Sequence, residues 1–102
     1  MARKEIERHD LFEKLDSIKC QSVWVRAAER LGFRITHGGK HPYVVRDPEN
    51  LNDADFRSSV TTIPSNLHRV INQKIFRQFQ DSPIFVRMNL SEEDLWRALD
   101  LL

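Results

Sequence analysis

Four histidines are the residues of this chain best suited to proton transfer, and two of them, His37 and His41, flank a Gly38-Gly39-Lys40 segment. Imidazole titrates near neutral pH, so a histidine can serve as a general base or acid. Cleavage of RNA without a metal requires a base for the 2′-hydroxyl proton, and cations or N–H donors for the phosphate. His41, Lys40 and the glycine amides supply these groups in one short segment. A polar hairpin turn whose histidines have no catalytic role is the alternative interpretation.

Further basic residues lie on a predicted helix later in the chain. His68 and Arg69 fall in its first turn, where helix N–H groups favour anions. Lys74 and Arg77 lie with Arg69 on its polar face, so all three could contact phosphate or could simply be solvated. His9 is expected at the surface.

Neither a metal nor a cofactor is predicted from this sequence. Two histidines are too few for a zinc site, which takes three or four protein ligands. Cys20 is the single cysteine, so it cannot form a disulfide within the chain. We expect Cys20 to be a buried or half-buried structural thiol, and a reducing cytoplasm fits this cysteine usage.

Length and charge limit the protein classes to consider. The 102 residues predict one domain, 30% of the residues are charged, and no apolar run is long enough for a membrane span. Residues 34–77 carry seven Lys or Arg and four Asp or Glu, whereas residues 78–102 carry two and five. A basic middle beside an acidic tail is compatible with a nucleic-acid surface in the middle, and equally with an ordinary solvated surface.

Hydrophobic spacing predicts two helices and then three strands. Residues 3–18 and 22–31 have helical periodicity, with Ser22 as a possible cap and Gly32 placed to end the second helix. Residues 33–37 and 41–46 alternate like the strands of a hairpin, and β-branched residues predict a strand over 58–63. The polar segment 47–56 between the last two strands is long for a hairpin connection.

Two further helices are predicted after the strands. One runs from Ser65 or Asn66 to about residue 80, and the other begins at Ser91, while 84–86 is expected to be a short strand or an extended tether. The predicted class is therefore α+β, with a three-stranded antiparallel sheet and helices on one face. Trp24 and Trp96 are expected in the core, although on amphipathic faces they could instead form a homodimer surface.

One run of motifs resembles the HicA toxin family. It comprises residues 38–45 (GGKHPYVV), the segment 61–64 (TTIP) and a helix that begins Leu67-His68-Arg69. The preceding residues 27–33 (AAERLGF) look like the first helix of that family, which ends in a Gly-Phe pair. The resemblance covers residues 22 to about 80, so we expect a HicA-like core there, with helical extensions over 1–21 and 81–102.

The resemblance implies a fold like the double-stranded RNA-binding domain and a type II toxin that cleaves mRNA without a metal. The catalytic histidine of the family maps onto His41. Gly39 and Lys40 would shape the approach to it. Arg69, Lys74 and Arg77, from the polar face of the later helix, complete the predicted set of RNA contacts. The resemblance also implies a HicB-type antitoxin protein that masks the histidine and the RNA surface.

The sequence also departs from the family pattern. Lys40 stands where many members have serine, the segment 47–56 is longer and more acidic, and the chain is less basic than expected for an RNA-cleaving enzyme. These departures favour the alternative hypothesis, a catalytically inactive RNA-binding or protein-interaction module of the same fold.

Overall fold

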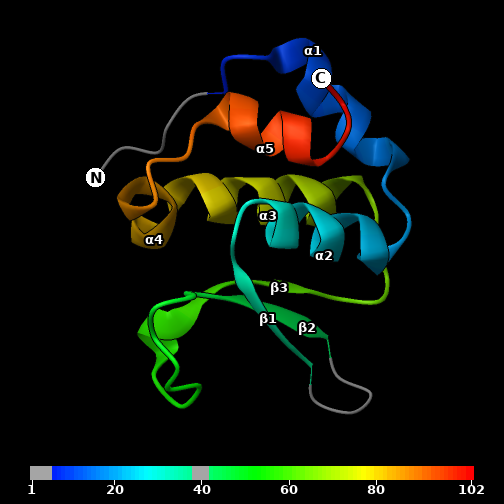
Figure 1. Cartoon of the computed structure of the whole chain (residues 1–102). Helices are drawn as coiled ribbons and strands as arrows, with labels where there is room; N and C mark the ends of the chain where they lie inside the picture. The colour runs from blue at the N-terminus through cyan, green and yellow to red at the C-terminus, as the bar shows by residue number, and fades with distance from the viewer. Residues whose placement is uncertain (1–5, 38–41) are drawn as a thin grey trace.

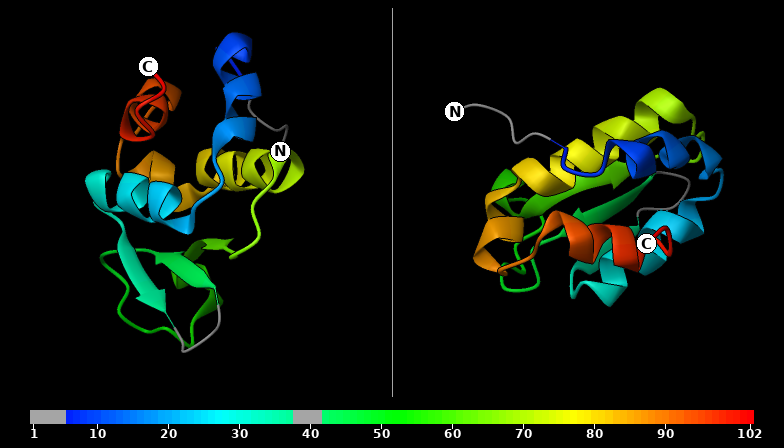
Figure 2. Two further views of the ribbon diagram at one scale, coloured as in Figure 1. Left: turned by 90° about the vertical axis from the view of Figure 1, so that its right-hand side faces the viewer. Right: turned by 90° about the horizontal axis from the view of Figure 1, so that it is seen from above.

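The computed structural model describes residues 6–37 and 42–102, which form three layers (Figures 1 and 2). The sheet is one layer, α2 and α3 cover one of its faces, and the first helical segment lies with α5 on the far side of these two helices. The α+β prediction with helices on one sheet face is confirmed. The elements are α1 (His9–Phe12), the 3₁₀ turn η1 (Glu13–Ser17), α2 (Gln21–Arg30), β1 (Arg34–His37), β2 (Tyr43–Arg46), the 3₁₀ turn η2 (Phe56–Ser58), β3 (Ser59–Ile63), α3 (Arg69–Asp81), α4 (Pro83–Arg87) and α5 (Glu92–Ala98).

The sheet has the order β1-β2-β3, and both neighbouring pairs are antiparallel. Successive side chains in a strand point to opposite faces, so Val45, Thr61 and Ile63 are buried beneath the helices. The register places His37 opposite Tyr43, and Tyr43 opposite Ile63, at one end of the sheet. The predicted antiparallel pairing of the first two strands is thus present. The predicted turn at Gly38-Gly39 and the predicted start of the second strand at His41 lie outside the described residues.

Helix α2 buries the stripe that its spacing predicted, with Trp24, Ala27 and Ala28 fully inaccessible. It ends as predicted at Gly32, which has φ +95°, and the Phe33 N–H donates to the carbonyl of Ala28 at 3.0 Å. The predicted Ser22 cap is wrong, because the helix begins at Gln21 and its N-cap residue is Cys20, whose side chain makes no capping hydrogen bond.

The long first helix predicted over 3–18 is wrong in the part of the chain that the structure describes. Only His9–Phe12 is α-helical, and Glu13–Ser17 forms a 3₁₀ turn. The apolar residues Phe12, Leu15 and Ile18 recur every three positions, and a 3₁₀ helix has three residues per turn. The apolar spacing that predicted an α-helix is therefore that of a 3₁₀ helix, which is wound more tightly.

Two further predictions are also wrong, the start of one helix and the conformation of residues 84–86. Helix α3 begins at Arg69 rather than at Ser65 or Asn66, because the chain first buries Leu67 and only then turns into the helix. Residues 84–86 belong to α4 rather than to a strand. The Ser82 hydroxyl accepts from the Ile84 N–H at 3.2 Å, and Pro83 occupies the first turn, where its missing N–H costs nothing.

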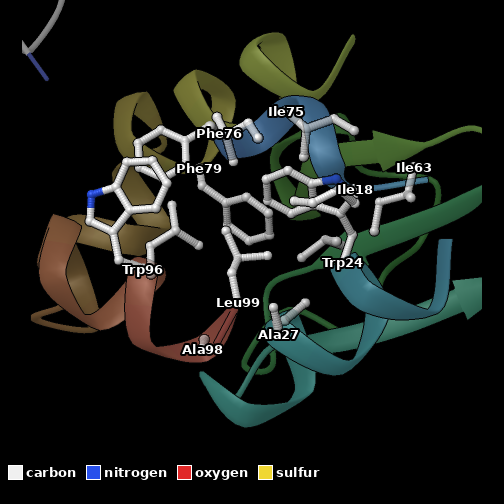
Figure 3. Close-up of a cluster of buried hydrophobic side chains, with 14 of the residues drawn as sticks. Ile18, Trp24, Ala27, Ile63, Ile75, Phe76, Phe79, Trp96, Ala98 and Leu99 are labelled. Carbon is white, nitrogen blue, oxygen red and sulfur yellow. The ribbon is translucent and has the colours of Figure 1, made fainter. Parts of the chain in front are cut away.

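The aromatic core lies between the helical layers (Figure 3). Trp24 and Trp96 are both fully buried, which confirms the core interpretation and removes both from any dimer surface. Their rings stack on Phe79 and Phe76, with centroids 5.9 Å and 4.2 Å apart respectively. The predicted α5 cap is also confirmed, since Ser91 and Asp94 form a reciprocal capping box.

Arginines attach the long acidic segment 47–58 to the rest of the fold. Arg87 donates two hydrogen bonds to the buried carboxylate of Asp47, one of them at 2.9 Å. Arg34 and Arg46, which are paired across β1 and β2, lie 2.9 Å and 3.6 Å from the Asp53 carboxylate. The loop is thus folded back over the sheet and held by ion pairs.

We expect Asp47→Asn to destabilise the protein by about 2 kcal/mol, because Arg87 keeps its charge and loses its buried anion. Hydrogen bonds from Arg87 hold the pKa of Asp47 below its ordinary value even though burial opposes this shift. Urea unfolding at neutral pH measures the change. Asp53→Asn, at a half-exposed carboxylate, is the matched control and should cost less than about 1 kcal/mol. Equal losses in both variants would contradict the expectation.

Candidate functional site

Several elements of the fold converge at one end of the sheet, on the right-hand side of Figure 1. The chain leaves β1 at His37 and enters β2 at Tyr43 here, and β3 ends here at Ile63. The N-terminus of α2 reaches the same place, since the Gln21 side-chain amide donates to the Ile63 carbonyl at 2.9 Å. Helix α3 also begins at this end of the molecule (Figure 1).

An aromatic pair forms the base of the connection between β1 and β2. The rings of His37 and Tyr43 stack with their centroids 4.1 Å apart and their planes inclined by 14°. His37 is exposed and Tyr43 is half-buried, so the pair is partly accessible to solvent. A planar, partly exposed pair of this kind can accept a nucleobase against it, because every base has a π-face.

A surface hollow of about 400 Å³ extends from Tyr43 along α2. Its other lining residues are Cys20, Gln21, Ser22, Val25, Arg26 and Glu29. The predicted burial of Cys20 is wrong: its thiol is exposed, because residue 20 precedes the helix and its side chain is outside the apolar stripe. The lining offers hydroxyl, amide and guanidinium groups that can donate hydrogen bonds to an anionic or polar ligand.

The cations at this end differ in how far they are already paired. Lys19 lies 3.8 Å from Asp16. Arg26 and Arg69 form no ion pair with any residue of 6–37 or 42–102. Arg69 is the first residue of α3, where helix N–H groups and a guanidinium attract the same charge. Both arginines are exposed, and Arg26 lines the same hollow as Tyr43.

The predicted site residues separate into three groups. His41, Gly39 and Lys40 lie outside the described residues, so their predicted roles stay predictions. Arg69 is at the end of the sheet just described. The remaining two, Lys74 and Arg77, lie further along α3 and line a separate hollow on its outer side, and the Arg77 guanidinium sits 5.2 Å from the centroid of the Phe12 ring.

Sequence reasoning missed three residues that the fold brings to this end: Tyr43, Gln21 and Arg26. Strand alternation could have indicated Tyr43, because it places His37 and Tyr43 on the same face of the predicted hairpin. Nothing in the sequence indicated that α2 would reach this end of the sheet. Of the other histidines, His9 is exposed as predicted and His68 is the exposed N-cap residue of α3.

Two broader observations limit the kinds of site present. The described part of the chain contains no group of three or more His, Cys, Asp or Glu placed to hold a metal ion. Among the same residues, no helix is long and apolar enough to cross a lipid bilayer. Comparison of the chain with protein families, with curated proteins and with solved structures gives no match.

Proposed function

We propose that this chain binds RNA at the end of the sheet that carries the His37–Tyr43 stack, and cleaves it with His41 as general base or acid. The observation that carries the proposal is the register that places His37 opposite Tyr43. The segment holding His41 joins these two residues, so a substrate at the stack lies beside that segment. The resemblance to the HicA toxins, the α2-β1-β2-β3-α3 order and the helices on one sheet face all support it.

The chemistry requires no group beyond those of the chain and the RNA. A base removes the 2′-hydroxyl proton, the 2′-oxygen attacks the adjacent phosphorus, and the bond from phosphorus to the 5′-oxygen breaks. An acid protonates the leaving 5′-oxygen, which gives a 2′,3′-cyclic phosphate and a 5′-hydroxyl end. His41 is proposed as the base or the acid, and His37, at the end of β1, is a candidate for the second titrating group.

Binding would combine stacking with phosphate contacts. One base stacks on the His37–Tyr43 pair, while Arg26 and Arg69 hold the flanking phosphates. Lys74 and Arg77 extend the basic surface along α3 for a longer RNA. A HicB-type antitoxin, as the resemblance implies, would inhibit by covering the same end of the sheet.

His41→Ala is expected to lower the rate of RNA cleavage by at least about 100-fold, since positioned general acid–base catalysis contributes about 10² to 10⁴. The measurement follows cleavage of a single-stranded RNA in EDTA, with detection of the cyclic phosphate. His9→Ala, at an exposed histidine of α1, is the matched control and should cleave like the wild type. A folded His41→Ala variant with wild-type activity would overturn the proposal.

The non-catalytic RNA-binding module remains the second candidate, and the overall charge of +1 is the observation that favours it. It predicts RNA binding that weakens as salt concentration rises, with no product in any variant. Binding measured alongside cleavage in the same RNA samples separates the two candidates.

A further inference from the structure

The outer edge of β3 is an open strand edge. β3 pairs with β2 on one side, and no described strand pairs with its other side. Natural proteins usually protect such edges with charged residues, prolines or a covering element. Residues Ser59–Ile63 contain neither a charge nor a proline, and Val60 to Ile63 are all β-branched. The edge therefore presents backbone N–H and C=O groups on a segment with strong strand propensity.

A groove of about 330 Å³ runs along this edge. Residues Ser59–Thr62 form the strand side, with Pro64 just beyond the strand, and Ile71, Lys74, Ile75 and Gln78 from α3 form the helix side. The Thr61 hydroxyl donates to the Gln78 side-chain oxygen and ties the two walls together. A strand edge facing a helix across a groove is the arrangement in which a peptide can add a strand and place alternate side chains against the helix.

The charge of the groove selects among possible occupants. Lys74 is the single charged residue in its lining, it is exposed, and it forms no ion pair with any described residue. A second copy of this chain would be a poor match. In a two-fold pairing of β3 with β3, both Lys74 side chains would line one interface, and β3 carries no carboxylate to neutralise them.

We propose that this groove binds an extended segment of a partner polypeptide that pairs with β3 and places an acidic side chain against Lys74. The five residues of β3 span about 16 Å, which corresponds to a segment of about five residues. Backbone hydrogen bonds would supply the affinity, and the carboxylate facing Lys74 would supply the preference. The groove shares Lys74 with the basic surface proposed for a longer RNA, but peptide binding does not depend on RNA binding and is tested without RNA.

The test measures fluorescence anisotropy of labelled hexapeptides with the whole chain and no RNA. The probes are alternating Thr/Val peptides with one Asp, Asn or Lys scanned through each position. We expect the best Asp peptide to bind at least tenfold more tightly than its Lys counterpart. Lys74→Glu should reverse that order, whereas Arg69→Glu, which reverses a charge on the same helix outside the groove, should change affinity less than twofold.

Backbone methylation of the best peptide tests the strand pairing itself. N-methylation at one alternating set of amides should abolish binding, and methylation at the other set should leave it unchanged, because alternate N–H groups of a strand point to opposite sides. Three results would overturn the proposal: affinity unchanged by methylation at either set of amides, equal affinity for the Lys and Asp peptides, or no binding by any peptide. So would self-association of the chain that Lys74→Glu abolishes.

Discussion

Asn72→Leu is expected to destabilise the protein by about 4 kcal/mol, the largest loss of stability that we anticipate for a single substitution. Asn72 is fully buried in α3, and its side chain makes three hydrogen bonds. Its oxygen accepts from the Trp24 indole N–H at 2.9 Å, and its amide donates to the carbonyls of Leu15 and Ile18 at 2.8 and 2.9 Å. Leucine has a similar size but removes all three hydrogen bonds, and only the Leu15 carbonyl keeps another donor, the Ile18 N–H at 3.1 Å.

Chemical denaturation monitored by tryptophan fluorescence measures the loss, since Trp24 itself reports on the site. Gln73→Leu is the matched control, because it removes a side-chain amide from the next, half-exposed position of the same helix. We expect it to change the free energy of unfolding by less than about 0.5 kcal/mol. A similar cost for both variants would show that the Asn72 hydrogen bonds contribute little.

The second large effect is expected from Glu92→Gln, at about 3 kcal/mol. The buried Glu92 carboxylate accepts four hydrogen bonds from three separate segments. Two come from the backbone N–H groups of Glu7 and Arg8, both at 2.9 Å, one from Gln80 at 3.0 Å, and one from the Trp96 indole at 2.8 Å. A glutamine would turn an N–H₂ group toward two of these donors, and its oxygen could serve only the other two.

The Glu92 contribution should depend on pH. Burial alone would raise the pKa of Glu92, but the hydrogen bonds from Glu7, Trp96, Arg8 and Gln80 together lower it below the ordinary value. A lowered pKa means that the stabilisation is complete above the ordinary pKa of about 4.3 and is lost as the pH falls through the lower value in the folded state. The difference in stability between wild type and Glu92→Gln should therefore shrink below about pH 4.

Glu93→Gln provides the control for charge at the same end of α5. Glu93 is exposed and pairs with Arg97 at 2.7 Å, so its loss should cost less than about 0.5 kcal/mol at any pH. A Glu93 effect as large as that of Glu92 would indicate a general response of the helix to its first-turn charges.

The sheet and the two helices that cover it could be predicted because local patterns determine them. Alternation in 33–37 and 41–46 predicted the two paired strands. Gly32 predicted the end of α2, because the backbone there has a positive φ that glycine adopts readily. The first helical segment was mispredicted because apolar periodicity was taken as α-helical where its spacing was that of a 3₁₀ turn. Residues 84–86 were mispredicted because a short apolar run is compatible with either a strand or a helix.

The site was predictable only in part. The sequence singled out the connection between the first two strands and Arg69, and the fold adds that α2 and the β3 terminus reach the same end. The contact between Gln21 and the Ile63 carbonyl joins residues 42 positions apart. Contacts of that range depend on how layers pack, which local periodicity does not specify. The same reason explains why Asn72 and Glu92 gave no signal as polar residues of the core.

The Glu92 carboxylate also links distant parts of the chain into one unit. Its bonds to Glu7 and Arg8 span 85 and 84 positions, so the segment before α1 is fastened to α5 as well as to its neighbours in sequence. Closing so long a loop lowers the entropy of the chain, and the hydrogen bonds offset this loss only when both partners are in place. We therefore expect the segment before α1 and the start of α5 to become ordered, and to open, together.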